Sequence, residues 1–454
     1  MATRSADFEL LIGDVPKPGA DRATKHRVQV TSPHGPEFEV MELDTEEPGF
    51  AHRLSAAAGQ APTFELRKAA GELLFARLFQ GKVLICWHGS LGRLKGGEFD
   101  TLRVRLWFCD SALAALPWEL LYDDSHFLAT DVRLTISRYL PGPEPSYLAP
   151  VPKLRVLGIE SRPTKGNLQQ IPQEAVDELR KMFDKLGGKV EYHPLPNPTL
   201  ETVRAKLADD FHVLHYLGHG VPNELVFTAA DGTPQPIRVE NLRQIMSGRR
   251  TLRVVVLNAC ASAQAGVGDV FAGVGPGLVQ IGLPAVLAMQ YNFVYLDVAT
   301  AFNTPFYKSL VGGSTVDAAV TEGRQGVSSK DVADRGWSTP VLYLGTRGGQ
   351  GLMVDQNPLT PYSLRRRTTL MGIVLAGPPA LPLGAWAAFR LFRWGATNTE
   401  RWTYIFAAVA IICLIIGWWL NFRKQGQVEG LGPVWFVVSA LLVLGITLRA
   451  YFTL

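Results

Sequence analysis

The sequence predicts an α/β protein with a mostly parallel sheet flanked by helices. A β-rich region precedes this sheet, and a helical membrane domain follows it. In residues 154–217, short apolar runs alternate with amphipathic stretches, the pattern of parallel strands joined by crossover helices. Residues 1–48 are polar and carry short strand-like patterns broken by proline and glycine. Charged residues make up 19% of the chain, below the roughly 25% of a typical soluble protein, which indicates a membrane-embedded part.

Net charge and cysteine content narrow the functional classes. A net charge of +4 gives no case for nucleic-acid binding. The four cysteines contain no CxxC pair and no disulfide framework, which fits a reducing cytosol where a lone cysteine can be catalytic. The first residues lack the apolar core of a signal peptide, so we expect the first 360 residues to stay in the cytosol. These cysteines are Cys86, Cys109, Cys260 and Cys413.

The first 150 residues predict an α+β region. Helical spacing of apolar residues predicts a helix over residues 63–79, while residues 83–87 fit either a strand or more helix. Glu119 and Asp123 are spaced to share a helical face, and a solvated face is favoured over acid–base work. Five prolines in residues 141–152 predict a linker. The predicted strands of this region are residues 8–12, 26–30, 37–43 and 102–106.

After the linker, the chain predicts alternating strands and helices. Gly187 and Gly188 are placed to end the first of these helices. The expected strands lie within residues 154–159, 189–192, 211–220, 252–260, 285–290 and 340–345. The expected helices lie within residues 171–186, 199–207, 239–245, 273–281, 297–310 and 316–327.

Two of these strands end in reactive residues. The strand expected within residues 211–220 ends just before His219, which lies between two glycines. The strand expected within residues 252–260 ends just before Cys260. Carboxyl ends of parallel strands form one edge of a sheet, where reactive groups collect. A histidine and a cysteine there are the minimum for a thiol nucleophile and its base. The amides of Gly220 and Cys260 are the natural donors for the oxyanion that such an attack creates.

Simpler interpretations stay open for these residues. Cys260 alone could be an inert buried thiol, and His212 and His215 lie within a buried strand, where hydrogen-bonded core histidines are favoured. The spacing of His215 and His219 matches a helical metal pair, but a strand destroys that geometry and no cysteine or carboxylate ligands lie nearby. We therefore expect no metal and no cofactor.

Three long apolar segments follow Arg365–Arg367. About 20 apolar residues span a bilayer, so residues 368–389 and 402–420 predict transmembrane helices, and the shorter 433–448 predicts a third. Tryptophans lie near the predicted ends, as interfacial aromatics do. We expect a membrane domain over residues 364–454, in contact with the lipid bilayer, and a multi-pass protein whose soluble part faces the cytoplasm.

The motifs around His219 and Cys260 resemble those of CHAT-domain proteases, in the caspase/separase clan of cysteine peptidases. Residues 214–220, Leu-His-Tyr-Leu-Gly-His-Gly, resemble the histidine motif, and residues 255–263, Val-Val-Leu-Asn-Ala-Cys-Ala-Ser-Ala, resemble the cysteine motif. Residues 277–288 and 337–345 resemble the segments that follow, and residues 116–123 resemble a region that often precedes such domains. The resemblance covers roughly residues 100–346.

The resemblance implies a caspase-like α/β domain over residues 151–350, after an N-terminal region of residues 1–150. It also implies peptide-bond hydrolysis, with His219 as general base and acid and Cys260 as nucleophile. Many relatives have an acidic residue just after the cysteine, where this chain has Ala261, so we expect a different substrate preference. Asp269 and Asp297 could form a negative pocket for a basic substrate residue, although a solvated loop and a helix cap are simpler interpretations.

The resulting hypothesis is a membrane-anchored cysteine endopeptidase that cleaves a protein partner. The family resemblance adds a role in bacterial defence or cell death, with an activating partner protein. The alternative is a sensor or scaffold whose transmembrane helices perturb the bilayer, with the CHAT domain as a switch or an inactive peptide-binding pseudoprotease.

Overall fold

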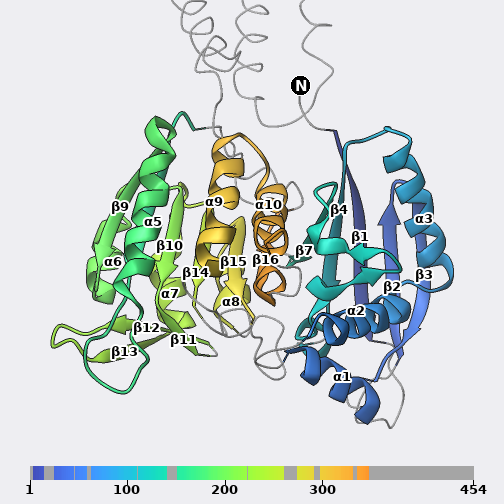
Figure 1. Cartoon of the computed structure of the whole chain (residues 1–454), viewed down its shortest axis with the longest axis horizontal. Coiled ribbons are helices and arrows are strands. Elements are labelled where there is room, and N and C mark those ends of the chain that lie inside the picture. The colour runs from blue at the N-terminus through green and yellow to red at the C-terminus, as the bar shows by residue number, and fades with distance from the viewer. Residues whose placement is uncertain are drawn as a thin grey trace, which may run out of the picture. The chain divides into compact units, whose positions relative to one another are not determined.

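The structure is a computed structural model, and its secondary structure alternates between strands and helices as the sequence predicts (Figure 1). The three apolar segments at residues 368–389, 402–420 and 433–448 lie outside the described residues, as do residues 141–150 of the predicted linker. Among the described residues, no helix is both long and apolar enough to cross a membrane. The described residues are 4–14, 25–44, 47–58, 63–109, 111–140, 151–221, 223–259, 273–290, 297–330 and 335–346.

Eleven of the described strands form one sheet, in the order β3-β2-β1-β4-β7-β16-β15-β14-β10-β8-β9. Neighbours are antiparallel at β3/β2, β2/β1 and β16/β15 and parallel elsewhere, so the predicted mostly parallel sheet is confirmed. In that order the strands are Gly35–Glu42, Lys25–Ser32, Ser5–Asp14, Thr101–Phe108, Leu134–Tyr139, Pro340–Leu344, Ala285–Met289, Val254–Asn258, Val213–Leu217, Leu154–Glu160 and Val190–Pro196.

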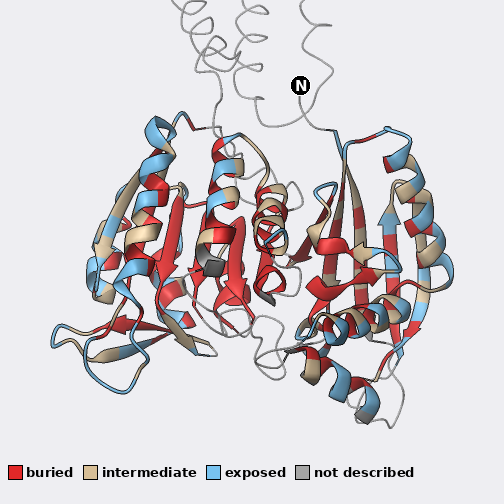
Figure 2. Ribbon diagram, viewed as in Figure 1, coloured by how far each residue is buried: buried red, intermediate tan, exposed pale blue. Residues whose placement is uncertain are grey.

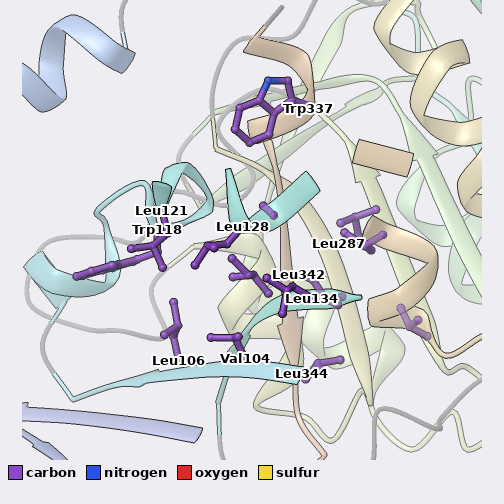
Figure 3. Packing of buried hydrophobic residues seen from close by; sticks show 14 of the residues in the cluster. Val104, Leu106, Trp118, Leu121, Leu128, Leu134, Leu287, Trp337, Leu342 and Leu344 are labelled. Atoms are coloured by element: carbon purple, nitrogen blue, oxygen red, sulfur yellow. The ribbon is translucent and has the colours of Figure 1, made fainter. Parts of the chain in front are cut away.

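The sheet runs without a break across the predicted boundary near residue 150. Strand β7 lies before the predicted linker, and β16 is the last strand expected after that linker. The two strands pair in parallel. Buried side chains from β4, β7, β16 and β15 meet in one cluster, in which Figure 3 shows Val104, Leu134, Leu342 and Leu287. The N-terminal strands and the later strands therefore share a single hydrophobic core.

Helices cover both faces of the later part of the sheet, because alternate residues of each buried strand point to opposite sides. Val213 and Val256 pack toward α5, α9 and α10, whereas Leu214 and Val255 pack toward α6, α7 and α8. Figure 2 shows buried positions along these strands and along the inner sides of the helices. The helices are α5 (Gln173–Lys185), α6 (Leu200–Lys206), α7 (Val239–Met246), α8 (Val274–Val279), α9 (Asp297–Val311) and α10 (Val316–Ser328).

Helices α2 (Phe64–Leu78) and α3 (Gly81–Lys95) pack on one face of the N-terminal strands. Thr63 begins α2 as predicted, because its hydroxyl accepts a hydrogen bond from the amide of Leu66. Residues 83–87, which fitted either a strand or a helix, lie within α3. The sequence did not predict α1 (Pro48–Ala58), and short elements α4 (Ser111–Ala114), η1 (Trp118–Leu120), β5 (Tyr122–Asp123), β6 (His126–Phe127) and η2 (Leu128–Thr130) connect β4 to β7.

The expectation of a solvated helical face at Glu119 and Asp123 is wrong. Glu119 lies in the single turn η1 and is 0% exposed. Its carboxylate accepts hydrogen bonds from Nε and Nη2 of Arg138 at 3.1 and 2.6 Å. A buried carboxylate needs a paired cation, and this cation comes from β7, so the ion pair was invisible to local sequence spacing.

A second, three-stranded sheet was also not predicted. It has the order β11-β12-β13, with bounds His219–Val221, Glu224–Thr228 and Pro234–Arg238. These strands are short, and Pro234 and Pro236 argue against a strand in sequence because proline donates no backbone hydrogen bond. The small sheet follows directly from β10, so it shapes the surroundings of His219.

Candidate active site

The strands that carry the two predicted reactive residues are direct neighbours. Strands β10 and β14 pair in parallel, with Leu217 opposite Asn258. Beyond that pair, the amide of Gly218 donates to the carbonyl of Asn258 at 3.3 Å. The next residue after Gly218 is His219, and the next after Asn258 is Ala259, which is fully buried. The prediction that both strands end at the same edge of the sheet is therefore confirmed.

The structure describes some of the predicted site residues and not others. His219 and Gly220 lie on β11, both half-buried. Cys260 and Asp269 lie outside the described residues, although Ala259, the neighbour of Cys260, is described. Asp297 is the first residue of α9, as the sequence predicted, and only its backbone is described.

The backbone of His219 is held by the strand before it and the strand after it. His219 pairs with Val226 across β11 and β12. The hydroxyl of Tyr216 lies 2.9 Å from the carbonyl oxygen of His219 and 2.6 Å from that of Val226. The hydroxyl of Ser161 also donates to the Val226 carbonyl, at 2.8 Å. The sharp change of direction between Tyr216 and His219 is thus fixed by hydrogen bonds from two buried hydroxyls.

Gly218 is required at this turn by the available space. A Cβ atom at this position would lie 2.4 Å from the hydroxyl oxygen of Tyr216. That distance is well inside van der Waals contact, and the same hydroxyl contacts the His219 carbonyl. Any larger residue would displace the group that positions His219.

Burial and one hydrogen bond act on the pKa of the His219 imidazole. Burial lowers its pKa from the ordinary 6.5, and a hydrogen bond to the backbone of Gln169 raises the pKa by a smaller amount. Gln169 belongs to the segment between β8 and α5, which is fixed to the small sheet because the amides of Thr164 and Lys165 donate to the carbonyl of Gly232. The net shift keeps the ring neutral at neutral pH, the form that can accept a proton.

His215 lies below the site as a core residue. It is 0% exposed, and its Nδ1 lies 2.7 Å from the hydroxyl of Tyr307 on α9. Its Nε2 lies 3.1 Å from Nδ2 of Asn258 and accepts from that amide, so Nδ1 carries the proton and donates to Tyr307. Burial lowers the pKa of His215 to about 3. The predicted hydrogen-bonded core histidine is confirmed, and this bond ties the end of β14 to β10.

His212, the second predicted core histidine, is hydrogen-bonded as expected, but it lies just before β10 and is half-buried rather than part of the core. Its Nδ1 accepts a hydrogen bond from the amide of Arg155 at 3.0 Å. Burial, followed by the charges of Arg253 and Arg155, lowers its pKa to about 4. Among the described residues, no group of three or more histidine, cysteine, aspartate or glutamate side chains could hold a metal ion.

Sequence reasoning missed the residues that position the histidine. Tyr216 lies inside the histidine motif, but its hydroxyl contacts depend on β12, which was not predicted. Ser161 and Gln169 follow β8 in a segment with no periodic pattern. The motif therefore marked His219 as a candidate, while the residues that hold its backbone were found only in the tertiary structure.

The fold and this edge of the sheet define an α/β protein with a half-buried, neutral histidine after a central parallel strand. A comparison with protein families matches residues 71–394 to the CHAT domain. The chain belongs to the CHAT domain family. The match begins within α2, well before residue 151, which agrees with a sheet that includes β4 and β7.

Comparisons with solved structures find similarity to cysteine proteinases at low identity. The Arg-specific cysteine proteinase gingipain R aligns with a TM-score of 0.40 and 12% identity, over 68% of this chain and 75% of that chain. A complex of pro- and mature gingipain domains from Porphyromonas gingivalis aligns with a TM-score of 0.40 and 11% identity, over 68% of this chain and 78% of that chain. A structure described as a protease aligns with a TM-score of 0.39 and 12% identity, over 68% of this chain and 75% of that chain. No curated protein matches the chain.

Proposed function

We propose that the chain is a cysteine endopeptidase in which His219 is the general base and acid and Cys260 the nucleophile. One observation carries this proposal: β10 and β14 are paired in register up to Leu217 and Asn258. His219 lies two residues beyond the first, and Cys260 two residues beyond the second. Ala259, the residue directly before Cys260 in the chain, is fully buried at this edge, which supports the pairing of the two groups.

The proposed chemistry uses the neutral form of His219. A free thiol has a pKa near 8.5, so it needs a base to become a nucleophile at neutral pH. The imidazole takes the Cys260 proton as the sulfur bonds to the substrate carbonyl carbon, and it then gives that proton to the departing amine as the C–N bond breaks. A water molecule next attacks the thioester, delivers a proton to His219 and releases the Cys260 thiolate with the acid product. The low pKa of His219 makes its protonated form an effective acid for the amine.

The oxyanion and the substrate side chain are assigned to nearby groups. We assign the oxyanion to the amides of Gly220 and Cys260, because fixed backbone donors stabilise developing negative charge. Asp269 and Asp297 are proposed to line a pocket for a basic substrate residue. The position of Asp297 supports its part in this pocket, because α9 follows β15, the strand next to β14.

The location of the reaction is part of the proposal. The apolar segments at 368–389, 402–420 and 433–448 support a multi-pass membrane domain, with the peptidase part in the cytoplasm. The substrate is a protein that comes within reach of that membrane surface, in a bacterial defence or cell-death process with an activating partner. No cofactor and no nucleic acid enter the scheme.

The test compares Cys260→Ala with Cys109→Ala in the full-length chain. Cys109 is an exposed thiol outside the proposed site, so its loss controls for general thiol effects. We expect wild type and Cys109→Ala to cleave the same members of a proteome-derived peptide library, and Cys260→Ala to cleave none. Cleavage that survives Cys260→Ala would remove the dyad assignment. Leakage of lipid vesicles that survives Cys260→Ala, without cleavage by wild type, would favour the sensor or membrane-effector alternative.

A further inference from the structure

The strand that carries His219 has a free edge. Strand β11 is the outer strand of the small sheet, and no described strand pairs with its other side (Figure 1). Its last residue, Val221, pairs with Glu224, so only two residues join β11 to β12. Residues that flank such a turn exchange backbone hydrogen bonds, and bonded pairs alternate with non-bonded pairs. The backbone groups of His219 and Val221 therefore point toward β12, whereas the N–H and C=O of Gly220 point to the free edge.

This edge gives a substrate chain one backbone position to bind, at Gly220. The Gly220 amide is one of the two groups to which we assign the oxyanion, so a substrate whose carbonyl oxygen binds there meets the free edge of β11. Side chains alternate between the two faces of a strand, so Val221 lies on the same face as His219 and about 7 Å further along the strand. A substrate in contact with the His219 ring therefore lies within reach of Val221.

The chemistry decides which part of the substrate passes Val221. A general acid must reach the departing amine, so the amine side of the cleaved bond lies next to the His219 ring. One side of this ring is taken by its hydrogen bond to the backbone of Gln169, whose segment is bonded to Gly232 in the turn between β12 and β13. Val221 lies at the other end of β12, beside the turn that joins it to β11. The residues on the amine side are therefore led past Val221.

The surface around Val221 suits an apolar side chain. Val221 is 42% exposed, and among the described residues it is the only exposed large hydrophobic residue of the small sheet. The residues opposite it on β12 and β13 are Glu224 and Arg238, whose side chains form an ion pair at 3.5 Å. Because these charges balance each other, they favour neither a basic nor an acidic partner. An apolar side chain that covers Val221 removes apolar surface of both groups from water, which is favourable.

We propose that Val221 determines specificity by contacting an apolar side chain in the first two residues after the cleaved bond of the substrate. This inference rests on the proposed function, in which His219 delivers a proton to the departing amine. It adds a requirement on the amine side of the substrate, separate from the pocket assigned to Asp269 and Asp297.

The test uses the full-length chain and a library peptide that the wild type cleaves. Three versions of this peptide carry leucine, lysine or glutamate at both of the first two positions after the cleaved bond. We expect kcat/KM of wild type to be at least about fivefold higher for the leucine version than for the other two. Val221→Asp should raise the lysine version relative to the leucine version by at least about fivefold, and Val221→Lys should do the same for the glutamate version. The same order of the three peptides in wild type and both variants would overturn the inference.

Val132→Asp is the matched control, because Val132 is 44% exposed and lies between η2 and β7, outside the small sheet. Its order of the three peptides should be that of wild type. Val221→Thr, which keeps the shape of valine, gives a second reading if Val221→Asp does not fold, with a weaker preference for leucine expected.

Peptide aminocoumarins, which have no residue after the cleaved bond, show the side on which Val221 acts. The preference among such substrates should be the same in wild type and Val221→Asp. A changed preference among aminocoumarins alone would place Val221 on the acid side of the bond and overturn the inference. Absence of cleavage of every substrate by wild type would instead overturn the proposed function, and the inference with it.

Discussion

His215 and His219 come from one short segment of chain, yet the structure gives them opposite environments. His215 is 0% exposed within β10, with both ring nitrogens in hydrogen bonds and a pKa of about 3. His219 lies just past the end of the strand, half-buried, with a smaller lowering of its pKa. The difference shows that the position relative to the end of the strand, rather than the residue type, decides how far each histidine is buried and how far its pKa falls.

The largest expected effect is a loss of catalytic rate when His219 is replaced. His219→Ala should lower kcat for the best library peptide by about 10²–10⁴, because general acid–base catalysis typically contributes this much. The melting temperature should stay close to that of wild type, since His219 is half-buried. His34→Ala, at an exposed histidine in the turn between β2 and β3, is the control and should leave kcat unchanged. A His219→Ala protein with wild-type kcat would show that His219 is not the base.

The second effect concerns stability at the other histidine. His215→Ala leaves the amide of Asn258 and the hydroxyl of Tyr307 buried without the ring that joins them. We expect the free energy of unfolding to fall by about 2–4 kcal/mol, since each unsatisfied buried group costs about 1–3 kcal/mol. Urea denaturation measures this difference. A loss below about 0.5 kcal/mol, the range of ordinary surface changes, would mean that the buried hydrogen bonds contribute little.

A smaller effect follows from the pKa of His215. The unfolded chain binds a proton at this residue below about pH 6.5, and the native state binds it only below about pH 3. Native stability should therefore be complete above pH 6.5 and fall as the pH drops toward 3, by up to about 1.4 kcal/mol per pH unit for this group. His212, with a pKa of about 4, adds to the same trend. Urea denaturation at pH 7, 6 and 5 should give a smaller acid dependence in His215→Gln than in wild type. Identical acid dependence in both proteins would contradict the assignment.

The smallest effect is a shift of the acidic limb in the pH profile of kcat/KM, caused by the lowered pKa of His219. Its pKa lies below 6.5, and the base acts only when neutral, so kcat/KM should stay high as the pH falls to 6.5. We expect the acidic limb of kcat/KM to have its midpoint below pH 6.5. A midpoint above pH 7 would indicate that the imidazole is held in its charged form in the free enzyme.

Much of the fold was predictable because it depends on local sequence patterns. The alternation of strands and helices over residues 154–217 and the end of α5 at Gly187, with φ of 63°, follow from periodicity and glycine chemistry. The hydrogen-bonded core position of His215 follows from its place within an apolar strand. The position of His219 at a strand end follows from the same pattern.

The features that could not be predicted depend on contacts between distant segments. The ion pair of Glu119 with Arg138 joins a single turn to β7, and no periodicity marks it. The pairing of β7 with β16 makes one sheet from segments on both sides of the predicted linker. The bond between His219 and Gln169 depends on the segment after β8 meeting the small sheet. Such contacts are chosen by tertiary packing, which the spacing of residues in sequence does not encode.

The most direct measurement of the central claim is covalent labelling of the thiols. Full-length wild type, His219→Ala and Cys109→Ala would be treated at pH 7 with a library-derived peptide that carries a thiol-reactive group, and the modified cysteine would be located by peptide mass mapping. The dyad predicts rapid labelling at Cys260 in wild type and in Cys109→Ala, and slow labelling at Cys260 in His219→Ala. Labelling of Cys260 at the same rate with and without His219, or labelling confined to Cys109, would contradict it.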